Sequence, residues 1–388
     1  MIIQKVKIFR ENKKFILGAV QLKEDRIEEV ILNQPWYSKA GEESLDGKGS
    51  YLIPGLIDLH FHGCKGDDFC DGTFEALQRI SEYEAAQGVT GIAPATMTLP
   101  IETLEHILMT AAEFKKEQEK KKNCLEADLL GINMEGPFIS PVKKGAQDER
   151  YCIPCSEAVY QKFQTAAKGL VKLIGVAPEE ADVLPFLEAV RGEVCVSLAH
   201  TNANYDTAKR ALDHGASHAV HLFNAMPAFT HREPGVIGAV ADSPHVTAEL
   251  ICDGIHLHPA MVRATFRMLG EDRIILISDS MRATGMSDGR YTLGGLDVDV
   301  KGNRAVLASD QTLAGSVTNL MNCMKNCVLT MGIPLAVAVL CASTNPAKRL
   351  GVYDRYGSIN IGKKANLVLL KEDLTVEEVW KNGVKLGK

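Results

Sequence analysis

The sequence predicts an α/β protein in which a (β/α)8 TIM-like barrel carries a small β-sandwich domain built from both ends of the chain. Three observations lead to this fold class. Between residues 51 and 351, eight short apolar runs alternate with helical patterns. Both ends of the chain instead hold short segments of alternating polar and apolar residues. Several apolar runs end in histidine, glutamate or aspartate, at the position where barrels of this kind carry their functional groups.

The composition is that of an ordinary globular protein. Its 388 residues, 46% of them hydrophobic, suffice for one large domain with an appendage or for two domains. A net charge of -6 argues against nucleic acid or an anionic membrane as the main partner. No run approaches the roughly 20 apolar residues of a membrane span, and the first residues alternate like a strand rather than a signal peptide. We therefore expect a cytoplasmic protein.

The two ends of the chain share the alternating pattern of antiparallel strands. Charged and glycine-bearing turns separate the segments, which are residues 4–8, 15–22, 26–32, 357–362, 365–370 and 376–384. Similar segments at both ends can pair with each other, so we expect residues 1–50 and 352–388 to form the small β domain. Residues 51–351 then form the barrel.

The middle of the chain alternates strand-like with helical patterns. The apolar runs are residues 52–62, 89–96, 129–135, 171–177, 194–200, 217–223, 246–251 and 274–278. Helical patterns span residues 74–87, 101–121, 205–214 and 259–269. Asn204 and Gly215 suit the start and the end of the third helix. A doubly wound open sheet would alternate in the same way, but its first strand would lead into a glycine-rich turn, where this chain has histidines.

The first apolar run ends in two histidines one residue apart. Alternate residues of a strand point the same way, so His60 and His62 project together from its C-terminal end. Such a pair alone is better explained by local hydrogen bonds. Further strand ends carry other metal-binding groups, namely Glu135 on the third run, His200 on the fifth, His221 on the sixth and Asp279 on the eighth. Together, nitrogen and carboxylate ligands predict a site for zinc, iron or manganese rather than calcium.

The ten cysteines are scattered and lack the density of a disulfide framework, so we expect reduced thiols. Cys152 and Cys155 with Cys323 and Cys327 have the residue types for a four-thiolate zinc site. The two pairs are far apart in the sequence, and the second lies in a helical pattern. We therefore expect the second pair to be small core side chains.

Residues 54–63, Pro-Gly-Leu-Ile-Asp-Leu-His-Phe-His-Gly, resemble the first-strand motif of the amidohydrolase superfamily. Later motifs resemble, in order and spacing, those of the N-acetylglucosamine-6-phosphate deacetylases, and they lie at residues 135–138, 143–147, 200–203, 221–226, 253–256, 278–279 and 313–316. The resemblance covers nearly the whole chain. It implies hydrolysis of the acetamide of N-acetylglucosamine 6-phosphate to glucosamine 6-phosphate and acetate, a reaction of amino-sugar catabolism and cell-wall sugar recycling.

The resemblance also implies roles for the strand-end residues. The principal metal site of the family corresponds to Glu135, His200 and His221. Its catalytic acid/base corresponds to Asp279, which also counts among the expected metal ligands. Because the histidine pair of the first run is intact, a second ion is expected there, with Glu135 as the bridge in place of the fourth-strand lysine of related binuclear enzymes. We expect one or two divalent ions per chain, zinc or iron, with manganese as a further candidate.

Amide hydrolysis explains why a metal and a carboxylate belong together. An amide is a poor electrophile, and water is a poor nucleophile at neutral pH. A divalent metal lowers the pKa of a bound water from about 15.7 towards roughly 7 and polarises the amide carbonyl. In this scheme Asp279 takes the proton of the metal-bound water as general base and delivers it to the departing amine as general acid.

The substrate pocket is assigned by the resemblance alone. Arg232 and His256 correspond to groups that bind the 6-phosphate, for which the planar fork of a guanidinium is well suited. Gln147 stands where some relatives have a histidine near the sugar. The complete set is Ala146, Gln147, Asn224, Ala225, Arg232, Asp253, His256, Leu313, Ala314 and Gly315, of which the last three form a wall around the acetyl group.

Alternatives stay open at this point. A deacetylase of N-acetylgalactosamine 6-phosphate would differ in contacts to one hydroxyl, which the sequence does not locate. A cyclic amidase of the same superfamily would use the bridging lysine that is missing here. A non-catalytic barrel would have lost ligands that are intact in this chain. The resemblance further implies a small-molecule substrate and a homodimer, in which a phosphate-binding residue could reach across the interface.

Overall fold

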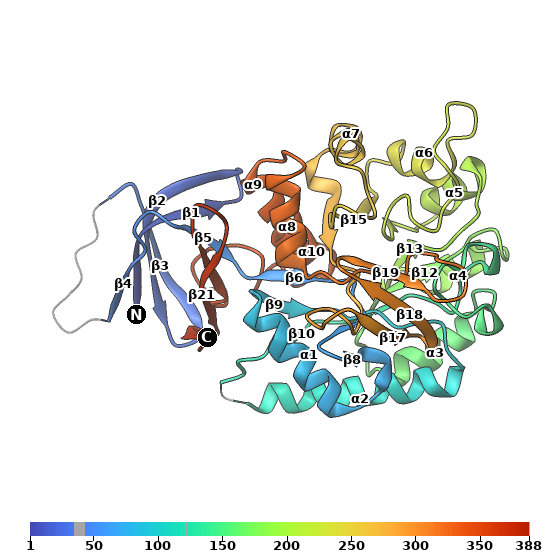
Figure 1. The fold of residues 1–388 in the computed structure, drawn as a ribbon, viewed down its shortest axis with the longest axis horizontal. Coiled ribbons are helices and arrows are strands. Elements are labelled where there is room, and N and C mark those ends of the chain that lie inside the picture. Colours follow the sequence, from blue (N-terminus) through green and yellow to red (C-terminus); the bar gives the residue numbers. More distant parts are fainter. Residues whose placement is uncertain (35–42, 122, 388) are drawn as a thin grey trace.

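The middle of the chain forms a curled parallel sheet (Figure 1). The computed structural model describes residues 1–34, 43–121 and 123–387. The strands pair in parallel in chain order, and they are β6 (Leu56–Asp58), β9 (Val89–Ile92), β10 (Asp128–Leu129) with β11 (Ile132–Met134), β12 (Val171–Val176), β13 (Cys195–Leu198), β14 (His218–Ala219), β15 (Thr247–Ile251) and β16 (Ile274–Ile277). Each predicted apolar run contains one of these strands. The sheet returns on itself after β16, because the amide of Asp279 donates to the carbonyl of His60 at 3.0 Å.

Helices surround this sheet (Figure 1). They are α1 (Phe74–Ala86), α2 (Ile101–Lys120), α3 (Glu157–Ala166), α4 (Leu184–Ala189), α5 (Tyr205–Asp213), α6 (Gly235–Ala241), α7 (Pro259–Leu269), α8 (Leu320–Leu329), α9 (Leu335–Val339), α10 (Asn345–Arg349) and the π-helix η5 (Leu340–Thr344). Short 3-10 turns are η1 (Phe69–Asp71), η2 (Pro141–Lys143), η3 (Glu149–Tyr151) and η4 (Glu271–Arg273). The four predicted helices are confirmed as α1, α2, α5 and α7. Asn204 begins α5 as predicted, since its side chain accepts from the amide of Thr207 at 2.9 Å. Within the described ranges, no helix is long and apolar enough to cross a membrane.

The first predicted strand is in fact two strands that belong to different sheets. β5 (Tyr51–Pro54) pairs with β1 (Ile2–Arg10) and β20 (Leu367–Leu370), whereas β6 pairs with β9. Pro54 has no amide hydrogen to continue a ladder. At the next residue the chain passes so close to β9 that a Cβ added to Gly55 would lie 2.2 Å from the hydroxyl oxygen of Thr90. The sequence analysis missed this break because the run is apolar on both sides of it.

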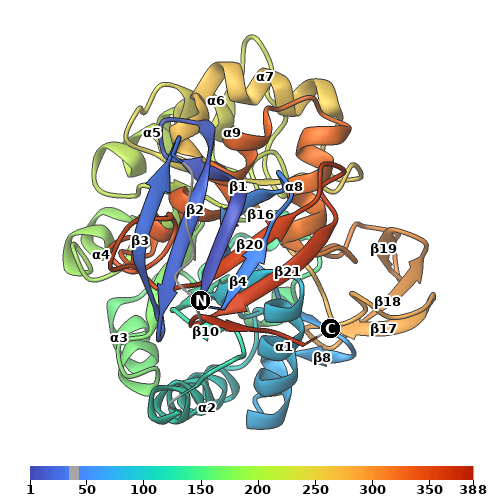
Figure 2. The ribbon, with the colours of Figure 1, turned by 90° about the vertical axis from the view of Figure 1, so that its left-hand side faces the viewer.

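Strands from both ends of the chain pair in one sheet at one end of the molecule, which Figure 2 shows from that end. Besides β1, β5 and β20, this terminal sheet contains β2 (Lys14–Lys23), β3 (Arg26–Leu32), β4 (Ser44–Asp46), β21 (Val376–Lys381) and β22 (Val384–Lys385). The strand order is β22-β21-β20-β5-β1-β2-β3, with β4 beside β1. Its buried residues, among them Ile8, Leu52 and Trp380, form a core of their own. Residues 35–42 of the predicted small domain lie outside the described residues.

A buried ion pair joins the terminal sheet to the curled sheet. Lys381 on β21 is fully buried, and its ammonium lies 3.0 Å from the carboxylate of Asp128 on β10. The hydroxyl of Tyr356 donates to the same carboxylate oxygen at 2.9 Å. The ammonium also donates to the carbonyl of Cys124 at 3.4 Å. These partners compensate the burial of the two charges, which would otherwise be costly.

A small antiparallel sheet, which the sequence analysis did not predict, follows β16. It consists of β17 (Gly289–Leu293), β18 (Leu296–Lys301) and β19 (Arg304–Leu307). Gly294 and Gly295 both have positive φ and form the tight turn between β17 and β18. The apolar face of this sheet packs on Met97 and Met281. A short hairpin of β7 (Gly63–Cys64) and β8 (Asp67–Asp68) follows the first histidine pair.

The second cysteine pair has the predicted core role. Cys323 and Cys327 lie on α8 and are fully buried. Cys152 and Cys155 are only half-buried. In the part of the chain that the structure describes, no cluster of metal-ligand atoms includes a cysteine. The four-thiolate zinc site is therefore not formed.

Candidate functional site

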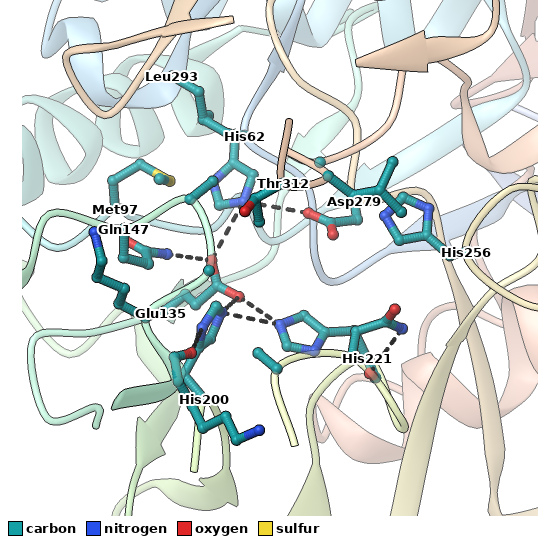
Figure 3. Close-up of a pocket in the computed structure, with 18 of the residues that line it drawn as sticks. His62, Met97, Glu135, Gln147, His200, His221, His256, Asp279, Leu293 and Thr312 are labelled. Atoms are coloured by element: carbon teal, nitrogen blue, oxygen red, sulfur yellow. Dashed lines mark hydrogen bonds and ion pairs between the residues drawn. The ribbon is translucent and has the colours of Figure 1, made fainter. Parts of the chain in front are cut away.

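The ends of five strands bring the predicted metal-binding side chains together, and Figure 3 shows all of them except His60. His60 and His62 follow β6, Glu135 follows β11, His200 follows β13, His221 follows β14 and Asp279 follows β16. Parallel strands place these ends at one end of the sheet, so the side chains converge. All six are buried.

Three of these residues adopt backbone conformations that residues other than glycine rarely adopt. The φ angle is 42° at His200, 27° at His221 and 50° at Asp279. A left-handed conformation at such residues costs of order 1–3 kcal/mol and persists only where the surrounding packing imposes it. Each of the three follows the end of a strand, where the chain leaves the extended conformation. This concentration of strain marks the strand ends as a functional site.

Glu135, His200 and His221 form the first cluster. Oε1 of Glu135 lies 3.1 Å from Nε2 of His200 and 2.9 Å from Nε2 of His221. The two Nε2 atoms are 3.2 Å apart. Nδ1 of His200 donates to the carbonyl of Lys143 at 2.9 Å, which leaves Nε2 of that ring to face the cluster.

His60, His62 and Asp279 form the second cluster, and Glu135 lies between the two. Nε2 of His62 is 3.3 Å from Oδ1 of Asp279 and 3.4 Å from Oε2 of Glu135. Nε2 of His60 is 3.3 Å from Oε1 of Glu135. In each cluster the ligand atoms lie within 4.8 Å of one another. The carboxylate of Glu135 thus faces both clusters, as a bridging ligand would.

The chemistry of these side chains fits a divalent metal. Nε2 of His60 is buried and has no hydrogen-bond partner among the described residues. The other nitrogen of this ring, Nδ1, is held by Glu249 at 2.8 Å, so Nε2 is the nitrogen that faces the cluster. A buried polar atom without a partner is costly, and a cation at the cluster would satisfy it. Imidazole nitrogens with carboxylate oxygens form the ligand set of zinc, iron or manganese.

The electrostatics of the two clusters favour bound positive charge. Burial raises the pKa of the Glu135 carboxyl, but His60 and His200 outweigh burial and hold this pKa well below its usual range. Burial disfavours protonation of His62, yet Asp279 and Glu135 raise the pKa of His62 to about 10. In the metal-free protein a proton therefore occupies His62, and a metal that binds there must displace it.

A cavity of about 410 Å³ opens onto both clusters (Figure 3). Among the predicted substrate-binding residues, it is lined by Ala146, Gln147, Asn224, Ala225, His256, Leu313 and Gly315. Gln147 also contacts the metal-binding residues, because its amide donates to Oε2 of Glu135 at 2.7 Å. Its carbonyl accepts from the amide of Thr98 at 2.6 Å, which fixes the orientation of this side chain.

Three predicted substrate-binding residues do not line the cavity. Ala314 is fully buried, and Asp253 contacts His256. Arg232 is exposed on the loop after β14, where the amide of Glu233 donates to the hydroxyl of Thr230 in a local turn. Arg232 does not line the cavity of its own chain, and its phosphate-binding role stays a prediction.

The cavity wall carries a histidine that a carboxylate orients. Nδ1 of His256 donates to Oδ2 of Asp253 at 2.8 Å, and the backbone amides of Ile255 and His256 donate to Oδ1 at 2.9 Å. Burial disfavours the imidazolium, but Asp253 outweighs burial and raises the pKa of His256. The wall of the cavity thus holds a cation-forming group beside Asp279.

Sequence reasoning missed part of the cavity wall and the residues behind it. The additional lining residues are Met97, Val142, Lys143, Lys144, Gly145, Leu293, Asp310 and Thr312. Leu293 belongs to β17, while Asp310 and Thr312 follow β19, in the segment for which no strands were predicted. Glu249 and His218, which contact each other behind the clusters, lie within apolar runs. The sequence feature that could have identified this pair is a charged residue inside a buried strand, because such a residue must have a partner.

Known proteins resemble this chain along nearly its whole length. A profile of the amidohydrolase family matches residues 51–386. An N-acetylglucosamine-6-phosphate deacetylase of Bacillus subtilis (strain 168) is 38% identical over 385 residues, which cover 97% of this chain and 94% of that protein. An N-acetylgalactosamine-6-phosphate deacetylase of Escherichia coli O157:H7 is 34% identical over 333 residues, which cover 86% of each chain.

Solved structures resemble the fold over the same length. The N-acetyl-D-glucosamine-6-phosphate deacetylase of Mycobacterium smegmatis, an aspartate-to-alanine variant in complex with N-acetyl-D-glucosamine-6-phosphate, has a TM-score of 0.91 at 30% identity. The match covers 99% of this chain and 98% of that one. A β-aspartyl dipeptidase of Fervidobacterium islandicum AW-1, at 16% identity and a TM-score of 0.61, shares the fold alone.

Proposed function

This chain belongs to the amidohydrolase family, and from that premise we propose that it is a metal-dependent N-acetylglucosamine-6-phosphate deacetylase. It hydrolyses the acetamide of N-acetyl-D-glucosamine 6-phosphate to D-glucosamine 6-phosphate and acetate. The observation that carries the proposal is the pair of adjoining clusters of histidines and carboxylates beside one cavity. At about 410 Å³ the cavity is within the usual range for small-molecule sites, and the deacetylases reported above act on such a sugar.

The metal-binding side chains divide between two positions. Glu135, His200 and His221 hold one divalent ion, and the His60–His62 pair with Asp279 holds a second, with Glu135 between them. Zinc or iron suits these ligands, and manganese is a further candidate. When bound, the metal supplies an activated water and polarises the amide carbonyl.

Asp279 is the group that moves protons in this proposal. Burial raises the pKa of its carboxyl, but the hydrogen bond from His62 and the charge of His60 outweigh burial and hold this pKa below its usual value. The carboxylate is therefore ionised at neutral pH and accepts a proton from the attacking water. It then delivers that proton to the nitrogen of the departing amine as the C–N bond breaks, which leaves a neutral amine and acetic acid. At neutral pH the acid gives up its remaining proton, which the free amine takes up, so the released products are acetate and the protonated amine.

The predicted substrate-binding residues hold the sugar phosphate. His256 and the backbone at Asn224 and Ala225 face the phosphate, while Gln147 hydrogen-bonds the sugar. The wall formed by Ala146, by Leu313 to Gly315 and by the loop of Asp253 encloses the acetyl group and the sugar ring. In a homodimer, Arg232 of one subunit extends to the phosphate in the cavity of the other, which its exposed position allows.

The architecture follows the same proposal. Residues 51–351 form a closed (β/α)8 barrel of the TIM type, and residues 1–50 with 352–388 form a small β-sandwich domain, with β5 as the strand that passes between them. The backbone bond from β16 back to the first strand end supports closure of the barrel. The enzyme works as a cytoplasmic homodimer on a small amino-sugar phosphate.

Two related activities are less well supported. A deacetylase of N-acetylgalactosamine 6-phosphate has a relative at 34% identity, against 38% for the glucosamine enzyme of Bacillus subtilis. A cyclic amidase would use a lysine at the end of the fourth strand. Here β12 ends without one, and Glu135 lies between the two clusters instead.

The proposed function is tested by acetate release from N-acetylglucosamine 6-phosphate, with the metal content of the same sample measured per chain. We expect release from this sugar to exceed release from N-acetylgalactosamine 6-phosphate and from unphosphorylated N-acetylglucosamine. Treatment with a chelator should abolish activity, and added zinc or iron should restore it. Metal-loaded protein that leaves N-acetylglucosamine 6-phosphate intact would contradict the substrate while sparing the hydrolase fold.

The KM for the phosphorylated sugar is expected to depend on the charge of His256. Asp253 raises the pKa of His256 above its usual 6.5, so the imidazolium attracts the phosphate below that raised pKa and is lost as the pH rises through it. KM should therefore increase at alkaline pH. In Asp253→Asn, the carboxylate is gone and the increase should begin at lower pH, which KM measurements between pH 6 and about 9 would show. Identical profiles for both proteins would rule out this role.

A further inference from the structure

Glu249 lies behind both clusters, and it is not among the residues that line the cavity. It is on β15 and is fully buried. Oε2 of Glu249 accepts from Nδ1 of His60 at 2.8 Å and from the backbone amide of His221 at 2.9 Å. Oε1 accepts from Nε2 of His218 at 2.9 Å, and Nδ1 of His218 in turn accepts from the hydroxyl of Thr247 at 2.7 Å.

This arrangement fixes which nitrogen of His60 faces the metal-binding residues. An ionised carboxylate only accepts hydrogen bonds, so the shared hydrogen lies on Nδ1 of His60. Nε2 of His60 is then the nitrogen left to bind a metal, and it lies 3.3 Å from Oε1 of Glu135. His218 supports the carboxylate from the other side through a second hydrogen bond. A buried carboxylate in an apolar strand is costly, and these donors are what make it tolerable.

The two histidines of the first strand differ in this respect. Nδ1 of His62 is buried and has no hydrogen-bond partner in the described ranges. Within the pair, only His60 therefore has its Nδ1 atom held by a carboxylate among the described residues. Because Oε2 of Glu249 also accepts from the amide of His221, the same carboxylate links the second cluster to a strand end of the first.

We propose that Glu249, supported by His218, is a positioning residue that sets the metal affinity of the position formed by His60, His62 and Asp279. The inference rests on the proposed function, since it takes the two clusters to be metal sites. Outer partners of this kind change metal affinity by about 10- to 100-fold. Glu249 acts through His60 and contacts neither the cavity nor the reacting atoms.

The test compares zinc binding by wild type, Glu249→Gln and Glu249→Leu. Each protein is stripped of metal, loaded with zinc and analysed for zinc per chain, and affinities are measured by competition with a chelator. We expect two ions in the wild type. The second ion should bind about tenfold more weakly in Glu249→Gln, which keeps an acceptor but loses the charge, and about 100-fold more weakly in Glu249→Leu. The affinity of the first ion should change much less.

A matched control separates this role from the loss of any buried carboxylate. Glu84 on α1 is also buried, and neither of its carboxylate oxygens has a hydrogen-bond partner among the described residues. Glu84→Gln should bind both ions as the wild type does. In a His60→Ala background, adding Glu249→Gln should leave the affinity of the remaining ion unchanged, because a glutamine oxygen still accepts from the amide of His221.

The outcomes distinguish the inference from the function on which it rests. Unchanged zinc affinity in Glu249→Gln overturns the inference and leaves the deacetylase intact, and this variant decides the matter even if Glu249→Leu does not fold. A wild type that binds a single ion also overturns the inference. A wild type that neither binds metal nor deacetylates the sugar overturns the proposed function, and the inference with it.

Discussion

Asp279→Asn is expected to lower kcat for N-acetylglucosamine 6-phosphate by about 10²- to 10⁴-fold. Asparagine keeps the size of the side chain but cannot accept a proton from water or deliver one to the amine. It should also weaken the contact to Nε2 of His62, which is 3.3 Å from the carboxylate in the native protein. Steady-state acetate release measures the loss, and calorimetry should show that the variant still binds the phosphorylated sugar.

The zinc content of Asp279→Asn shows how the side chain acts. Loss of activity with full metal content indicates a proton-transfer role, whereas loss of one ion per chain indicates that Asp279 acts first as a ligand. Asp310→Asn is the matched control, since Asp310 lines the same cavity and belongs to neither cluster. Its kcat should stay near that of the wild type. Wild-type activity in Asp279→Asn would exclude the proposed mechanism.

Asp128→Ala is expected to lower the free energy of unfolding by about 3–5 kcal/mol. Among the described residues, the substitution leaves the fully buried ammonium of Lys381 with the carbonyl of Cys124, at 3.4 Å, as its one remaining partner. It also removes the acceptor of the Tyr356 hydroxyl. Urea unfolding measures the change. The zinc concentration is kept constant so that bound metal contributes equally to the stability of both proteins.

Two further variants test whether the loss of stability in Asp128→Ala comes from leaving a buried charge unpaired. In Asp128→Leu with Lys381→Met, both charges are removed, so the loss of stability should be smaller than in Asp128→Ala. In Asp46→Ala, an exposed ion pair with Lys5 is lost, and the unfolding midpoint should barely move. If the double variant is as unstable as Asp128→Ala, the cost lies in packing rather than in the unpaired charge.

The convergence of the metal-binding residues followed from local sequence patterns. His60 and His62 had to share a side of their strand because side chains alternate. Glu135 and Asp279 could be placed beside that pair once their apolar runs were identified as strands, since parallel strands end at the same edge of a sheet. Periodicity and strand direction are properties of short segments, so short segments were enough to predict that the metal-binding residues converge.

Other features depend on which segments meet in space. Glu249 contacts His60 across β15 and β6, and no local pattern pairs these two strands. The break at Gly55 depends on the approach of Thr90 from the neighbouring strand. In each case a tertiary contact made the difference.

The terminal sheet has a consequence for synthesis of the protein on the ribosome. β5 emerges early, but one of its two neighbours is β20, and Pro54 pairs there with Leu367 near the end of the chain. Until β20 is made, one edge of β5 has no native partner, and such an edge can pair with other chains. Contacts between segments so far apart in sequence form slowly. The nascent chain therefore depends on protection of this edge, by chaperones or by fast completion of translation, more than a chain whose first strands pair only with each other.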